Sequence, residues 1–150
     1  MPFSYRFHHL LRLAEHEEEE VRRRLAMKDG QIAAAEAEIR KIQLERQHGL
    51  EAKAVDLIAG AMERVRLYPA YFLRLQNRED FQNEELERLR KQREKIAQEL
   101  AEKRQTRKTY EKIRERDEAV FKKQEQRRDQ KNMDEFASRL TRPFAEENHA

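Results

Sequence analysis

Residues 86–131 read LERLRKQREKIAQELAEKRQTRKTYEKIRERDEAVFKKQEQRRDQK, and this stretch decides the fold. It contains neither Gly nor Pro, and most of its residues favour helix. Its apolar residues recur at intervals of three and four, which is the period of a helix face. The stretch therefore predicts one long charged helix that forms part of a rod, and not the core of a globular enzyme.

The composition of the whole chain supports a rod. Of 150 residues, 42% are charged and 37% hydrophobic, with three Gly, three Pro and no Cys. A single compact core of ordinary thickness is not expected from such a composition. Disorder is the alternative, but the apolar periodicity favours helix. The absence of Cys excludes disulfides and thiolate chemistry. Because there is no signal peptide and no long apolar run, we expect a cytoplasmic chain without a membrane span.

The first fifty residues carry a heptad pattern, in which an apolar stripe needs a partner helix. Its two series of positions are Phe7, Ala14, Val21, Ala35 and Ile42, and Leu11, Leu25, Ile32 and Ile39. Three acidic residues, Glu18 to Glu20, stand four positions before Arg22 to Arg24, so we expect three ion pairs along the helix surface. Near Gly49 the stripe is expected to slip by one position, to Leu50, Ala54, Leu57, Ala61, Val65 and Tyr68.

Pro69 is the first firm break, because proline donates no hydrogen bond and disfavours helix at the residue before it. We therefore predict a helix over about 5–67, a turn over about 68–82, a second helix over about 83–140 and a flexible tail over 141–150. The two arms would each be about 60 residues long, or about 90 Å. Equal arms favour an all-α fold consisting of a long antiparallel two-helix coiled-coil hairpin in one domain.

The second arm becomes polar along its expected seam, where Lys103, Arg107, Asp117 and Gln124 replace apolar residues. Residues 88–131 hold 17 basic and 9 acidic side chains, a formal charge of +8. Such a stretch either faces water around a stalk or meets an acidic partner. Nucleic acid is a rival partner, but acidic residues interrupt the basic ones at nearly every turn, so no specific nucleic-acid binding is expected.

The sequence offers little support for a catalytic or metal site. His8, His9 and His16 lie near several Glu residues, but the spacing of a zinc helix is missing. No phosphate loop and no nucleophile–base arrangement is present. We therefore predict no catalytic residue, no metal, no cofactor and no enzymatic activity.

An aromatic group surrounds the expected turn and comprises Tyr68, Tyr71 and Phe72, with Leu75 beside them. One interpretation is a cap that closes the hairpin. The other is an exposed anchor for a second protein, because aromatic residues are frequent hot spots. Both interpretations stay open at this point.

Two stretches resemble the FliJ family of flagellar type III export proteins. They are the opening YRFHHLLRLAE at residues 5–15 and, more specifically, DQKNMDEFA at residues 129–137. The resemblance in length and layout covers nearly the whole chain. It implies a coiled coil similar to the central stalk of rotary ATPases, and a non-enzymatic role in flagellum biogenesis and motility.

The resemblance also implies partners. The paired termini would enter the hexameric export ATPase and promote its assembly, near its regulator, through Phe7, Leu11, Arg128, Asp129, Gln130, Lys131, Met133, Asp134 and Phe136. The middle of the hairpin would contact the export-gate membrane protein at the cytoplasmic face of the inner membrane through Tyr68, Tyr71, Phe72, Leu75, Ile39 and Ile42. Glu45 and Gly49 depart from the aromatic residues of some relatives. Escort of export chaperones or substrates is a further implied role. The stalk of a virulence type III secretion system and a generic coiled-coil adaptor are the alternatives.

Overall fold

The computed structural model describes the backbone of residues 2–147 and the side chains of residues 2–141. The chain forms α1 (His8–Ile58), the short α2 (Met62–Val65) and α3 (Tyr68–Glu147), and the described residues contain no strand. The all-α antiparallel hairpin that the sequence predicts is confirmed. The chain divides into two compact units, residues 18–102 and residues 1–17 with 103–150.

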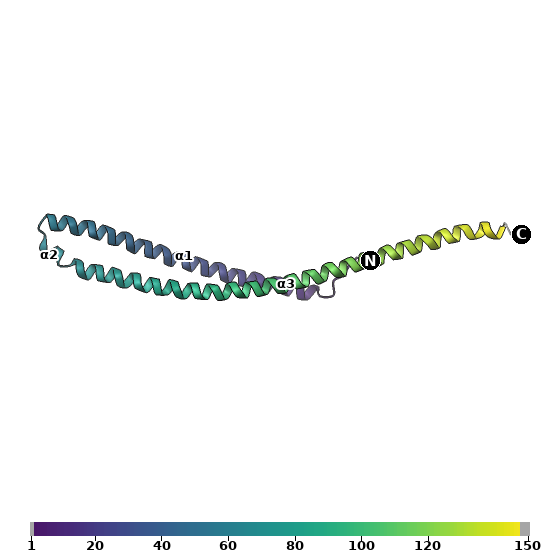
Figure 1. Cartoon of the computed structure of the whole chain (residues 1–150), viewed down its shortest axis with the longest axis horizontal. Coiled ribbons are helices and arrows are strands. Elements are labelled where there is room, and N and C mark those ends of the chain that lie inside the picture. The colour runs from purple at the N-terminus through teal and green to yellow at the C-terminus, as the bar shows by residue number, and fades with distance from the viewer. Residues whose placement is uncertain (1, 148–150) are drawn as a thin grey trace. The chain divides into compact units, whose positions relative to one another are not determined.

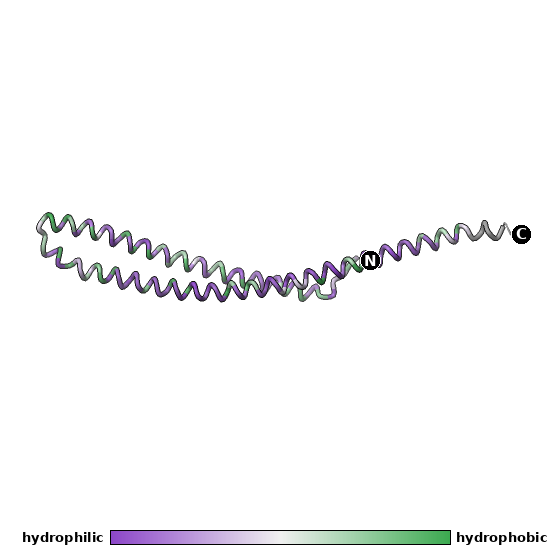
Figure 2. Tube along the Cα trace, viewed as in Figure 1, coloured by the Kyte–Doolittle hydropathy of each residue, from purple (hydrophilic) through white to green (hydrophobic). Residues whose placement is uncertain are grey.

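Within the unit of residues 18–102, α1 and the first part of α3 lie side by side and antiparallel, joined through α2 (Figure 1). A hydrophobic cluster of Ala35, Leu86 and Leu89 forms the core, and Ile32 and Ile39 pack against it. Ile42 and Leu75 are the largest fully buried side chains, with 0% and 2% of their surface exposed. Figure 2 shows hydrophobic residues interspersed with hydrophilic ones along both helices, in keeping with an apolar stripe on one face of each.

The seam of α1 does not slip near Gly49, contrary to prediction. Gly49 is itself buried, whereas Leu50 is 53% exposed and Leu57 is 49% exposed. The heptad register therefore continues unbroken from Ile42 to Gly49 and on to the buried Asp56. A glycine occupies the seam because aromatic rings from α3 pack over it.

α1 ends at Ile58, and the predicted helix to residue 67 is wrong. Gly60 has a φ of +72°, the left-handed conformation that favours glycine. The N–H of Ala61 donates to the carbonyl of Asp56 at 2.9 Å, and the N–H of Gly60 donates to that of Leu57 at 3.2 Å. These two bonds form a Schellman motif, which ends a helix by satisfying its last carbonyls.

The connection between the long helices therefore lies at 59–67 and not at 68–82. α3 begins at Tyr68, so Pro69 stands in its first turn, where backbone N–H groups have no helical acceptor and proline is tolerated. Pro69 begins a helix where we expected it to end one. Because the turn comes early, the arms are unequal, with 51 residues in α1 and 80 in α3.

α3 also continues past its predicted end near residue 140, through Pro143 to Glu147. A proline in a helix removes one hydrogen bond to the preceding turn, and here a further turn follows it. The predicted flexible tail begins at residue 141, and its last residues, 148–150, lie outside the described part of the chain.

In the unit that contains the N-terminus, the opening segment packs along α3. The Phe3 and Phe121 rings lie 5.5 Å apart, and the Tyr5 hydroxyl donates to the carbonyl of Tyr110 at 2.9 Å. Burial raises the pKa of the Tyr5 hydroxyl, and the nearby Asp117 carboxylate raises it further. Beyond Phe121, every α3 side chain up to residue 141 is exposed except the half-buried Glu125. That end of α3 has no partner helix among the described residues.

Ion pairs cross the hairpin of residues 18–102. Arg24 pairs with Glu99 at 2.6 Å, and Arg78 pairs with both Glu38 and Glu45 at 3.0 Å. The hydrogen bonds to Glu45 and Glu38 raise the pKa of the Arg78 guanidinium. Exposed ion pairs contribute little to the free energy of folding. They do favour this pairing register of α1 and α3 over neighbouring registers, because opposite charges face each other across the hairpin.

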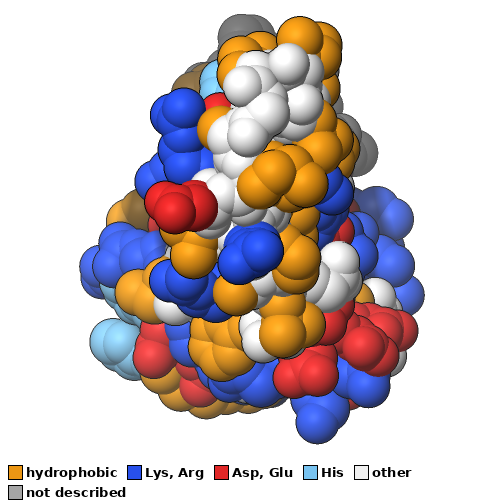
Figure 3. All heavy atoms as spheres, turned by 90° about the vertical axis from the view of Figure 1, so that its left-hand side faces the viewer, with side chains coloured by type: hydrophobic (Ala, Val, Ile, Leu, Met, Phe, Trp, Pro, Cys, Tyr) orange, Lys and Arg blue, Asp and Glu red, His pale blue; other side chains and the backbone are white. Residues whose placement is uncertain are grey.

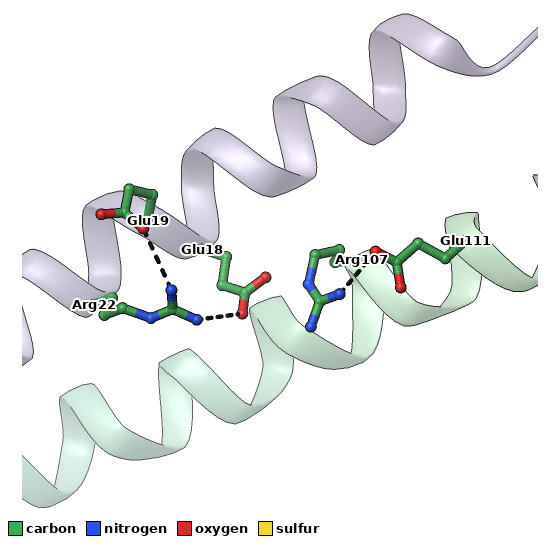
Figure 4. A network of polar contacts seen from close by, with 5 residues as sticks. All are labelled: Glu18, Glu19, Arg22, Arg107 and Glu111. Atoms are coloured by element: carbon green, nitrogen blue, oxygen red, sulfur yellow. Dashed lines mark hydrogen bonds and ion pairs between the residues drawn. The ribbon is translucent and has the colours of Figure 1, made fainter.

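Of the three ion pairs expected along α1, two form. Arg22 contacts Glu18 at 3.1 Å and Arg23 contacts Glu19 at 3.7 Å, whereas Arg24 pairs with α3 instead of Glu20. Figure 4 shows Arg22 between Glu18 and Glu19 and, on α3, Arg107 bonded to Glu111. Glu18 is only 4% exposed, so it occupies the seam and not the outer surface.

Candidate interaction surfaces

The aromatic residues at the start of α3 form a cluster at the hairpin tip. The Tyr68 and Phe72 rings stack with centroids 6.0 Å apart, and Tyr71 and Phe72 lie 5.5 Å apart. We call Tyr68, Tyr71 and Phe72 the tip cluster. All three side chains are half-buried, so each keeps a part of its ring accessible.

Tyr68 is held to the end of α1 by a hydrogen bond. Its hydroxyl donates to Asp56 Oδ2 at 2.6 Å, while Arg64 Nε lies 3.7 Å from Asp56 Oδ1. The bond to Asp56 raises the pKa of the Tyr68 hydroxyl, and burial raises it further. Asp56 thus links α1, the residues of α2 and the start of α3.

The tip cluster packs closely on α1. A Cβ added to Gly49 would lie 2.8 Å from Tyr71 Cε1 and 3.1 Å from Phe72 Cε1. Beside this contact lies an open groove of about 590 Å³, whose lining includes His48, Gly49, Leu67, Tyr71 and Arg74. Gly49 therefore makes room for rings that come from α3.

The other residues predicted for the gate contact lie in the core. Leu75 and Ile42 are fully buried, and Ile39 is packed against the core cluster. Leu75 and Ile42 are therefore closed to a partner in this hairpin, whereas the half-buried Ile39 keeps only part of its side chain accessible.

Apolar side chains are also exposed at the hairpin tip. The sequence pattern assigned Leu57 to the seam and did not single out the others. Figure 3, which views this end of the molecule, shows hydrophobic side chains between charged ones. They include Leu57 (49%), Met62 (57%), Leu67 (68%) and Ile58 (89%). Sequence reasoning missed this exposure because it extended the first helix to residue 67, whereas α1 ends at Ile58.

The residues expected to contact the ATPase ring divide into two groups. Leu11 is 2% exposed and belongs to the core, and Phe7 is half-buried beside Tyr5 and Arg6. The C-terminal group is exposed throughout, on α3. Met133 and Phe136 are 70% and 66% exposed and share one helix face with Leu140, which is 58% exposed. The group comprises Arg128, Asp129, Gln130, Lys131, Met133, Asp134 and Phe136.

Metal-binding geometry is not found in the part of the chain that the structure describes. The His8 and His9 rings lie 5.9 Å apart, but no set of three or more His, Asp or Glu side chains converges there. Over the same residues, none of the helices has an apolar stretch that would reach across a bilayer.

These features define a class of protein, the antiparallel coiled-coil hairpin, here with exposed apolar side chains at the turn and at the end of the longer helix. A family model described as "Flagellar FliJ protein" matches residues 3–143. The chain therefore belongs to the flagellar FliJ family and is a component of the flagellar protein export apparatus. That family consists of export components and not of enzymes. No curated protein and no solved structure matches the chain in the same comparisons.

Proposed function

We propose that the chain is the stalk of the flagellar export ATPase. The exposed end of α3 enters the hexameric ring and promotes its assembly and turnover, beside the regulator of the ATPase. The tip cluster contacts the export-gate membrane protein, and the hairpin between them couples the two. The chain works in the cytoplasm, at the inner face of the membrane, and escorts export chaperones or substrates there.

The observation that carries the proposal is the unpartnered end of α3. From residue 126 to residue 141 every side chain is exposed. An isolated helix of this length is marginal in water, because most helical stability comes from packing against a partner. A long exposed helix with an apolar face therefore fits a segment that is stabilised inside another protein.

Removing residues 129–150 is expected to abolish stimulation of the export ATPase. The hairpin should stay folded, because its packing contacts end near Phe121. The measurement is the ATPase rate and hexamer fraction with each form of the chain, beside circular dichroism. A point variant, Met133→Ser with Phe136→Ser, should reproduce most of the loss, whereas Leu50→Ser, an exposed change on α1, should not. Full stimulation by the truncated chain contradicts the proposal.

Phe72→Ala is expected to weaken binding to the export gate by about 2 kcal/mol, the usual effect of a hot-spot aromatic residue. ATPase stimulation should be retained, because it depends on the other end of α3. Phe81→Ala is the matched control, since Phe81 lies on the same helix and is 63% exposed. Gate pull-down, ATPase rate and thermal melting are measured for both variants. A drop in melting temperature together with both activities would make Phe72 a structural cap only.

A further inference from the structure

A separate charged feature lies on α3 between residues 103 and 131. At about 100° per residue, six basic side chains fall within an arc of about 140°, and we call them the basic face: Lys108, Lys112, Arg116, Lys123, Arg127 and Lys131. The acidic residues of the same segment all fall outside this arc: Glu111, Glu115, Asp117, Glu118, Glu125 and Asp129. The acidic residues of this segment are therefore confined to one side of the helix, whereas basic residues lie on both sides.

The basic face is open to solvent. All six side chains are exposed, whereas Tyr110, Asp117 and Phe121, on the side toward the N-terminal segment, are half-buried. Two neighbouring cations outside the arc are paired, Arg107 with Glu111 and Lys122 with Glu118. No member of the basic face has a carboxylate partner among the residues that the structure describes.

Helix stability does not account for this arrangement. Like charges four residues apart repel and weaken a helix, and the basic face contains four such pairs, beginning with Lys108 and Lys112 and ending with Arg127 and Lys131. Placing the acidic residues between them would remove the repulsion. These four pairs therefore weaken the helix, and an anionic partner would relieve their repulsion.

We propose that the basic face binds the anionic surface of a phospholipid bilayer. The six cations lie on one side of a helical segment about 35 Å long, so they can meet a flat layer of headgroups together. Each Lys or Arg near such a surface strengthens binding about fivefold, without any apolar anchor. This surface is separate from the tip cluster, and it shares only Lys131 with the residues proposed to contact the ring.

The shape and composition of the basic face favour lipid over the two other anionic partners. The arc contains no aromatic residue, and its only well-exposed large apolar side chain is Val120, so it lacks the hot-spot core of a protein interface. On duplex DNA, only a few cations of a straight row can contact phosphates, because the phosphate backbone winds around the DNA axis. A bilayer is flat, so its headgroups can contact the whole row.

The test is co-sedimentation of the full chain with vesicles of phosphatidylcholine, with and without phosphatidylglycerol. The chain should bind only the vesicles that contain phosphatidylglycerol, and salt should weaken binding because headgroup charges are screened within about 10 Å. The triple variant Lys108→Gln, Lys112→Gln, Arg116→Gln should bind roughly a hundredfold more weakly. The triple variant Lys123→Gln, Arg127→Gln, Lys131→Gln should lose a similar factor.

The matched control removes the same charge elsewhere, in Arg23→Gln, Arg88→Gln, Lys91→Gln, whose residues pair with carboxylates of their own helices. This control should keep most of the binding. Circular dichroism shows whether each variant remains helical. Equal binding to neutral vesicles, an equal loss in the control, or preferential binding of duplex DNA when DNA competes with the vesicles would each overturn the proposal.

Discussion

Replacing Ile42 with Ala is expected to lower the free energy of unfolding by about 2–5 kcal/mol, the range for a large side chain removed from a well-packed core. Ile42 is 0% exposed and occupies the seam at the middle of the hairpin. A two-helix rod has a thin core, so neighbouring side chains have few ways to close the cavity. The measurement is chemical denaturation followed by circular dichroism.

The control for this prediction is Leu50→Ala on the same helix. Leu50 is 53% exposed, so its loss should change stability by less than about 0.5 kcal/mol. The comparison also tests the register, because a seam that slips at Gly49 would bury Leu50. Similar losses at the two positions would contradict the continuous register.

Two glycines of α1 are expected to respond to alanine in opposite directions. At Gly30 nothing lies within 4 Å of an added Cβ, so Gly30→Ala should stabilise the chain by about 1 kcal/mol through helix propensity. At Gly49 the same methyl group meets the rings of Tyr71 and Phe72, and such overpacking costs about 1–3 kcal/mol. Gly49→Ala should therefore destabilise the chain in spite of the same gain in propensity.

Thermal or chemical unfolding of the two variants beside the parent measures this difference. The double variant Gly49→Ala, Phe72→Ala completes a double-mutant cycle. Removing the Phe72 ring should also remove most of the loss of stability that the Gly49→Ala methyl group causes. Stabilisation by both alanines would mean that the tip cluster does not pack on Gly49.

The fold class was predictable from the sequence because a heptad pattern in a chain rich in helix formers leaves few alternatives. The position of the turn was not. Pro69 looked like the strongest break, yet proline is compatible with the first turn of a helix, and the residue that ends α1 is Gly60, through its left-handed conformation. Gly49 and Gly60 both stood in this region, and the local sequence did not show which of them would be left-handed.

The candidate surfaces were predictable to a similar extent. Tyr68, Tyr71 and Phe72 do lie together, as their spacing indicated. Ile42 and Leu75 share the same apolar pattern but are buried, because helical spacing identifies a face without saying whether a partner helix or solvent covers it. The exposed end of α3 was missed for a related reason. Equal arms followed from the wrong turn, and equal arms would have given residues 122–141 a partner.

The proposals for the ring and for the lipid surface both depend on a hairpin that leaves the end of α3 unpartnered. The chain contains no Cys, so spin labels can be placed at single introduced cysteines. Ser4 and Val120 line the same groove, and a Ser4→Cys, Val120→Cys pair should give a short distance. A Ser4→Cys, Leu140→Cys pair should be longer by about 30 Å, the rise of the intervening helix. A short distance from position 4 to position 140, with a long one to position 120, would contradict the account.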